Sequence, residues 1–183
     1  SQCSTPKHKG HGMNQPPTAS SSPFHQGEQI LQRRAGKREA MEQFGRKVIR
    51  PYLPEQHRAF YAQLPFLVAG CVDEDGWPWA SIIAGQAGFV ASPSATELSI
   101  AQPAIKALSQ KHDPLARALT TVGSPIGLLG IELPTRRRNR VNAKVTNVEG
   151  DTVLQVDQAF GNCPQYIQTR VFDAARAPYA PGK

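Results

Sequence analysis

The chain has little cysteine and no long hydrophobic run, and both shortages exclude classes of protein. Its 183 residues contain three cysteines, at positions 3, 71 and 163, which are odd in number and far apart. This spacing matches neither a disulfide framework nor paired zinc ligands, so we expect no metal site. No apolar run approaches the about 20 residues of a membrane helix, and the first residues lack the apolar segment of a signal peptide. We therefore expect a cytoplasmic protein without a membrane partner.

The signs of the common nucleotide-binding folds are missing too. No Gly-rich phosphate loop follows a strand, and strands do not alternate with helices as they do in a parallel sheet. Short apolar runs instead follow one another, separated by turn sequences such as DEDG. The predicted strands are 66–72, 77–85, 88–91, 97–101, 126–133, 138–148 and 152–160. With helices at the ends of the chain, they predict an α+β barrel of about six antiparallel strands.

The composition predicts one domain between two tails. Residues 1–23 are rich in Ser, Pro, Gly and His and nearly lack large apolar side chains, so they cannot offset the entropy of ordering. Met13 is a candidate natural start within this segment. We expect the domain to span residues 24–175 and a C-terminal tail to span 176–183.

Helix signals are concentrated before the first strand. We expect helices between 26 and 63, with breaks at Gly36 and Gly45, and with His57 on the surface. Asp113 followed by proline predicts an N-cap and the start of a further helix. A last short helix is predicted over residues 163–170.

Basic residues are concentrated in one predicted strand. The formal net charge is +7, and positions 136, 137, 138 and 140 are all arginine. Side chains two apart on a strand lie on the same face. Val141, Ala143 and Val145 mark one face as the core side. The opposite face carries Arg138, Arg140, Asn142, Lys144 and Thr146, with no acidic residue.

Three interpretations of this basic face compete. It is a solvated strand face, a nucleic-acid groove, or a site for a small phosphorylated ligand. A nucleic-acid groove normally interleaves aromatic residues for base stacking, and this strand has none. Guanidinium groups bind phosphate oxygens in a bidentate manner, which favours the phosphorylated ligand.

Four stretches carry a resemblance to a known family. They are FHQGEQILQRRAG (24–36), WPWASIIAG (77–85), IGLLGIELPTRRRNRVNAKV (126–145) and QAFGNCPQYIQTR (158–170). With them, the chain resembles the pyridoxamine 5'-phosphate oxidase-like, FMN-binding split-barrel family, and within it a subgroup of uncharacterised flavoproteins. The resemblance implies a six-stranded antiparallel split β-barrel with peripheral helices. It also implies a homodimer that holds FMN at the subunit interface.

The resemblance also implies which residues bind the cofactor. The early strand would contact the flavin and ribityl chain, and the arginine strand would lie beside FMN. The Arg-Lys pair with which the family holds the phosphate is not evident, and Lys106, Lys111 or the helix start at Asp113 are the candidates that would replace it. The closing motif GNCPQYIQTR would form a pocket wall. The implied FMN-binding residues are Trp79, Ser81, Ile82, Ile83, Gly85, Lys111, Arg138, Arg140, Asn142, Asn162, Cys163 and Tyr166.

Departures from the family limit the activity that we expect. Gly85 ends the early strand, where oxidases of pyridoxamine phosphate carry a lysine, and their Tyr/Arg/Ser substrate set is not visible. We therefore expect an FMN-dependent oxidoreductase that does not oxidise vitamin B6, with a small molecule or a nicotinamide nucleotide as electron donor. No catalytic residue can be assigned. The rival hypothesis is a flavin-binding or flavin-sensing module without catalysis, and nucleic-acid binding is the weakest hypothesis.

Overall fold

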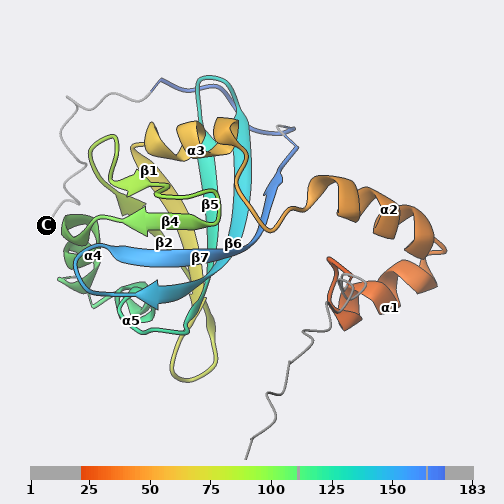
Figure 1. Ribbon diagram of the computed structural model, residues 1–183, viewed down its shortest axis with the longest axis horizontal. Coiled ribbons are helices and arrows are strands. Elements are labelled where there is room, and N and C mark those ends of the chain that lie inside the picture. Colours follow the sequence, from red (N-terminus) through yellow and green to blue (C-terminus); the bar gives the residue numbers. More distant parts are fainter. Residues whose placement is uncertain (1–21, 111, 164, 172–183) are drawn as a thin grey trace, which may run out of the picture.

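The computed structural model describes residues 22–110, 112–163 and 165–171, and within them the chain is an α+β protein. Seven strands form one antiparallel sheet in the order β2-β1-β5-β6-β7-β4-β3. The sheet is strongly curled, so that its concave side encloses the core (Figure 1). Except for residues 22 and 23, the predicted tails 1–23 and 176–183 lie outside the described ranges. The antiparallel α+β class that the sequence predicts is confirmed.

The strand positions follow the predicted segments closely. The strands are β1 (Phe66–Val72), β2 (Pro78–Ala84), β3 (Val90–Ala91), β4 (Glu97–Ile100), β5 (Pro125–Glu132), β6 (Arg137–Asn147) and β7 (Thr152–Gly161). β1 and β2 form the hairpin that the DEDG turn predicts, and the amide of Asp73 donates to the carbonyl of Trp77. The alternation predicted for β6 is also confirmed, because Val141, Ala143 and Val145 are buried in it.

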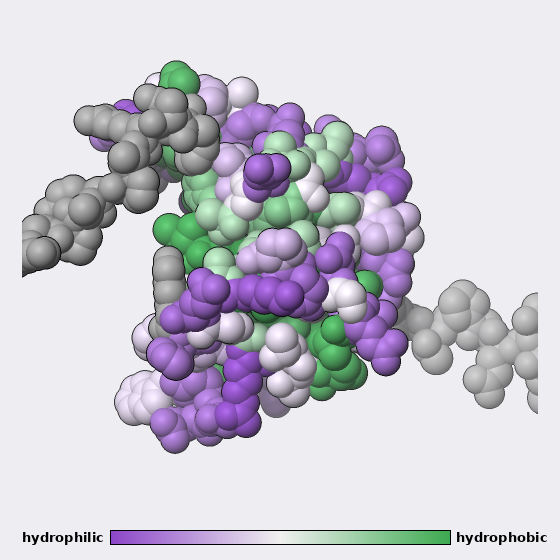
Figure 2. All heavy atoms as spheres, turned by 90° about the vertical axis from the view of Figure 1, so that its left-hand side faces the viewer, coloured by the Kyte–Doolittle hydropathy of each residue, from purple (hydrophilic) through white to green (hydrophobic). Residues whose placement is uncertain are grey.

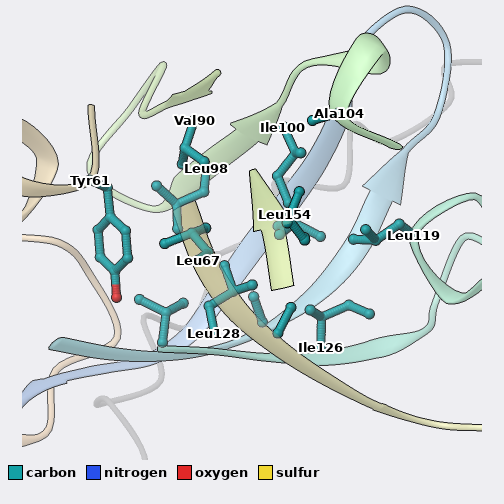
Figure 3. Close-up of a cluster of buried hydrophobic side chains, with 14 of the residues drawn as sticks. Tyr61, Leu67, Val90, Leu98, Ile100, Ala104, Leu119, Ile126, Leu128 and Leu154 are labelled. Carbon is teal, nitrogen blue, oxygen red and sulfur yellow. The ribbon is translucent and has the colours of Figure 1, made fainter. Parts of the chain in front are cut away.

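The core is built from the inward residues of the curled sheet. Figure 3 shows Leu67, Leu98, Leu128 and Leu154 meeting from different strands. Leu67, Leu128 and Leu154 lie at buried positions of strands in which burial alternates, whereas β4 is buried at three successive residues from Leu98. Cys71 belongs to the same core, as predicted, and burial together with two nearby carboxylates raises the pKa of its thiol.

Five helices lie around the sheet in the described residues. They are α1 (Gln26–Arg34), α2 (Arg38–Val48), α3 (Glu55–Ala62), α4 (Gln102–Ser109) and α5 (Pro114–Leu119). α3 crosses one end of the sheet, α4 and α5 lie at another side, and α1 and α2 extend away from the sheet (Figure 1). On the side of α4 and α5, hydrophobic atoms gather toward the middle of a largely hydrophilic face (Figure 2). In the described part of the chain, no helix is long and apolar enough to cross a membrane.

Three helix predictions need correction. Gly45 does not break α2, because it is buried and packs so closely that an added Cβ would lie 2.5 Å from Phe24 Cε2. α4 was not predicted, since its N-cap Ala101 offers no side-chain cap. The helix expected over 163–170 does not form in its described residues, where 165 and 166 form a turn and 167–170 are irregular. The break at Gly36, which has a φ of 62°, and the Asp113 cap of α5 are confirmed.

Tyr61 connects α3 to the sheet through buried packing and a hydrogen bond, and substitutions at this position test the fold directly. Its side chain is fully buried, and its hydroxyl donates to the carbonyl of Asn139 at 3.0 Å. Replacing Tyr61 with Ala should lower the free energy of unfolding by about 3–5 kcal/mol, because a large cavity remains. Tyr61→Phe should cost only about 1 kcal/mol, the value of one hydrogen bond. Urea denaturation measures both.

The matched control is Tyr52→Phe. Tyr52 is 44 % exposed, so removal of its hydroxyl should change the free energy of unfolding by less than about 0.5 kcal/mol. Equal stability of Tyr61→Ala and wild type would contradict the packing described here.

Candidate functional site

A row of paired residues crosses five strands on the outer face of the sheet, the side away from the core. Val68 pairs with Ile82 on one side and with Leu129 on the other. Leu129 pairs with Arg140, which in turn pairs with Phe160. Ile82 is 63 % exposed. The outer face is therefore apolar over β2, β1 and β5 and becomes cationic at β6.

The next row on the outer face is nearly flat. Gly70 pairs with Ala80 and with Gly127, and Gly127 pairs with Asn142 of β6. Neither glycine has a positive φ. A Cβ built on either would meet no heavy atom nearer than 3.5 Å. Nothing in the described chain therefore requires glycine at these two positions. Because Gly70 and Gly127 have no side chains, they leave an open flat area on the sheet, which we call the glycine floor. A planar group or another chain can lie on it.

Polar groups border this floor on one side. The amide of Asn142 donates to Gln158 Oε1 at 2.9 Å, and Lys144 Nζ lies 3.8 Å from Asp157 Oδ2. The exposed guanidinium of Arg140 has no hydrogen-bond or acidic partner among the described residues. The cation of Arg140 thus remains available beside the glycine floor.

A second cationic feature is a pocket of about 320 Å³ at one end of the sheet. It lies between the first turn of α3, the turn that joins β5 to β6, the start of β6 and the end of β7. We call it the arginine pocket. Its lining residues include Gln56, His57, Arg136, Arg137, Arg138, Asn139 and Asn162.

Packing and hydrogen bonds hold two of these arginines in place. The guanidinium of Arg137 lies 5.0 Å from the ring centroid of Phe60, a cation–π contact. Arg138 Nη2 donates to the carbonyl of Cys163 at 2.5 Å, and the amide of Asn162 donates to the carbonyl of Arg138 at 2.8 Å. Two hydrogen bonds therefore connect the closing motif to the start of β6, and Asn162 of this motif lines the arginine pocket.

The charge of the arginine pocket is not balanced within the described residues. There, none of the arginines at 136–138 and 140 forms a salt bridge. The nearby carboxylate of Glu132 instead accepts hydrogen bonds from Gln63 and Thr135. A cluster of guanidinium groups without carboxylates creates a positive potential that attracts anions.

Arg136 is held in an unfavourable backbone conformation. Its φ is 62°, in the left-handed region, which costs about 1 kcal/mol for a residue other than glycine or asparagine. Its side chain has no partner in the described residues. Glycine at this position would remove the conformational strain. The presence of arginine despite this strain suggests that its side chain has a role in binding.

His57 lies buried beside these arginines. It is 7 % exposed, and its Nδ1 has no hydrogen-bond partner; the same is true of the buried Nε of Arg138. Burial lowers the pKa of His57, and the cations of Arg50 and Arg137 lower it further. The prediction that His57 lies on the surface is wrong, because α3 packs this side toward the sheet.

A third group joins the predicted FMN-binding residues Trp79 and Ser81 to Asp113, the N-cap of α5. Ser81 Oγ donates to Asp113 Oδ2 at 2.5 Å, and Trp79 Nε1 lies 2.9 Å from Ser81 Oγ and 3.2 Å from Asp113 Oδ1. Asp113 also borders a wider hollow of about 650 Å³ with the acidic residues at 73–75. This concentration of carboxylates makes the start of α5 a poor phosphate anchor.

The remaining residues of the early strand have different environments. Ile82 points outward, whereas the side chain of Ile83 is fully buried in the core. A Cβ on Gly85 would lie 2.6 Å from Phe89, so close packing explains that glycine. Lys111 lies outside the described residues.

The closing motif is only partly brought to the site. Asn162 lines the arginine pocket, and Cys163 reaches it through its carbonyl. Tyr166 is 94 % exposed. No helix forms over residues 165–171, so the predicted closing helix does not position Tyr166 at the site.

The structure therefore divides the predicted site among three places. Arg140, Asn142 and Ile82 share the outer face, Arg138 and Asn162 share the arginine pocket, and Ser81 lies with Trp79 and Asp113. His57 was missed, although its spacing from Phe60 and Tyr61 places all three on one side of α3. In the described ranges, no group of three or more His, Cys, Asp or Glu residues could hold a metal ion.

Comparisons with family models, curated proteins and solved structures each found no match. The outer face and the arginine pocket are the features of the molecule from which a function can be inferred.

Proposed function

We propose that the protein is an FMN-binding oxidoreductase that acts as a homodimer, with a split barrel whose outer face carries the flavin. One observation carries the proposal: the glycine floor of β1 and β5 lies beside the cation of Arg140, which no described residue pairs. A flavin ring is planar and fits a surface without side chains. Its phosphate and its electron-rich reduced ring both favour nearby cations.

The residues present fit the cofactor in three respects. Gly70 and Gly127 leave the sheet surface open, Asn142 offers an amide at its edge, and Arg140 supplies charge. When bound, FMN would supply hydride and electron transfer, which none of these side chains can perform. Their own role is to bind and orient the ring and to stabilise negative charge on it. Reduced nicotinamide nucleotides or other small organic molecules are the donors that we propose.

The homodimer has its own support. Exposed apolar side chains accompany the floor, with Ile82 63 % and Val72 56 % exposed. The extended arm of α1 and α2 also exposes Leu31 and Phe44, at 64 % and 57 %. A second copy that covers the outer face would remove this apolar surface from water and would exclude water from the flavin.

Titration of the purified protein with FMN tests the proposal. We expect saturable binding that quenches flavin fluorescence, and light scattering should give twice the mass of one chain. NADH or NADPH added without oxygen should then bleach the visible absorbance of the bound flavin. Because the alternative function is a flavin-binding module, bleaching decides between the two.

The controls are free FMN with the same nucleotide and the protein with riboflavin in place of FMN. Riboflavin lacks the phosphate, so weaker binding would measure the phosphate contribution. A protein that ignores FMN would refute both the oxidoreductase and the flavin module. Stable FMN binding without bleaching by any donor would favour the module.

A further inference from the structure

We infer that the arginine pocket binds the phosphate group of a small phosphomonoester. The pocket lies at the end of the sheet, between α3 and the turn before β6, and it is separate from the glycine floor on the outer face. The inference does not depend on the flavin proposal, because the pocket has its own donors, its own volume and its own buried groups.

The donors match phosphate better than they match other anions. Arg136, Arg137 and Arg138 present guanidinium groups, and the side chains of Asn139 and Asn162 add amides. Guanidinium groups form bidentate, charge-assisted hydrogen bonds with phosphate oxygens, and several of them are needed to balance two negative charges. A carboxylate offers only one charge and two oxygens, so it would leave more of this cluster unpaired.

Two residues that line the pocket each carry a buried polar atom without a hydrogen-bond partner in the described part of the chain. These atoms are Nδ1 of His57, whose side chain is more than nine-tenths buried, and Nε of Arg138. Leaving buried polar groups unsatisfied is costly, and native proteins seldom do so without a reason. An anion in the pocket would stabilise the positive charge of Arg138 and would favour the protonated form of His57.

The backbone of Arg136 supplies an independent observation. A φ of 62° favours glycine or asparagine, yet arginine occupies the position, and its side chain forms no hydrogen bond or ion pair with the described residues. Strained residues often accompany binding sites, where the side chain compensates for the strain once the ligand is present.

The volume limits the size of the ligand. At about 320 Å³ the pocket is at the lower end of the range for small-molecule sites. It suits a phosphate with a short carbon skeleton, and it does not suit a polymer. The phosphate can come from a separate phosphorylated substrate or from the cofactor itself, with the rest of FMN extending toward the outer face.

Calorimetry with inorganic phosphate and with glycerol 3-phosphate tests the inference at constant ionic strength, with glycerol and chloride as controls. We expect saturable binding of both phosphates and none of glycerol. Arg136→Asn keeps a residue that tolerates the left-handed backbone and removes one guanidinium, so it should weaken binding at least tenfold. Arg34→Asn, an exposed change on α1, removes the same charge and should leave binding unaltered.

His57→Leu separates binding from folding. It replaces an unpartnered buried imidazole with an apolar side chain, so the melting temperature should rise by about 2–4 °C, while phosphate binding weakens. Equal affinity of wild type, Arg136→Asn and His57→Leu would overturn the inference, and so would binding that chloride reproduces.

Competition identifies the source of the phosphate. If FMN displaces glycerol 3-phosphate and riboflavin does not, the pocket holds the phosphate of the flavin. If saturating FMN leaves the affinity for glycerol 3-phosphate unchanged, the pocket serves a separate phosphorylated ligand. A protein that binds phosphate and ignores FMN would refute the proposed function and leave this inference intact.

Discussion

Replacing Arg138 and Arg140 together with alanine is expected to abolish FMN binding while the chain remains folded and dimeric. Hydrogen bonds to charged groups contribute about 1.5–3 kcal/mol each, so loss of two arginines should raise the dissociation constant by about two to four orders of magnitude. Fluorescence titration measures this change. Arg140 is exposed and unpaired, whereas Arg138 is half-buried and bonded to the carbonyl of Cys163. The single Arg140→Ala variant should therefore leave stability closest to wild type.

The control for this prediction is the Arg33→Ala/Arg34→Ala double variant. Both residues are exposed on α1, so this variant loses the same net charge from a surface far from β6. It should retain wild-type affinity for FMN. Wild-type affinity in the Arg138/Arg140 variant, with circular dichroism unchanged, would refute the placement of the flavin beside β6.

The fold could be predicted from the sequence where the hydrophobic pattern is local. The bounds of β1 match the predicted segment at both ends, and in β6 the alternation of apolar and basic residues gives the two faces directly. Prediction failed where distant contacts decide the structure. Gly45 continues a helix because Phe24 packs against it, and residues 165–171 do not form a helix although their sequence permits one.

The candidate site could be predicted only as a set of residue types. The sequence identified the basic face of β6, but it could not show that Arg138 turns toward the closing motif while Arg140 remains on the outer face. That separation depends on the pairing of β6 with β7 and on the position of α3. Gly70 and Gly127 were also missed, since a glycine matters here only through what its neighbours in the sheet leave open.

The sequence predicted one binding surface on the arginine strand, whereas the structure has two separate features there, the outer face and the arginine pocket. The outer face is flat and largely apolar, and Arg140 adds a cation without a partner among the described residues, which suits a ring and a second copy of the chain. The pocket is concave, strongly cationic and of limited volume, which suits a phosphate. The two features therefore predict different responses to substitution: Gly127 belongs to the outer face alone and Arg136 to the pocket alone, whereas Arg138 lines the pocket and lies on the same strand as Arg140.

Gly127→Val gives the sharpest test of the glycine floor, because it adds bulk without removing a polar group. A Cβ at this position would meet only ordinary contacts, at 3.9 Å from Asn142 Oδ1 and 4.0 Å from the carbonyl of Gly70. Since valine favours strands and glycine weakens them, the free energy of unfolding should stay within about 1 kcal/mol of wild type or rise. The valine methyl groups would nevertheless stand on the floor, so FMN affinity should fall at least about 100-fold, the effect of losing about 2.7 kcal/mol.

A graded series and a distant control decide whether the effect is steric. Gly127→Ala adds a single methyl group and should weaken FMN binding less than Gly127→Val does. Ala91→Val adds similar bulk to the exposed side of β3, at the opposite edge of the sheet from β2, and should leave FMN affinity unchanged. If Gly127→Val binds FMN as wild type does, the flavin does not lie on this floor. Because phosphate binding in the arginine pocket does not involve Gly127, it should be the same in all four proteins.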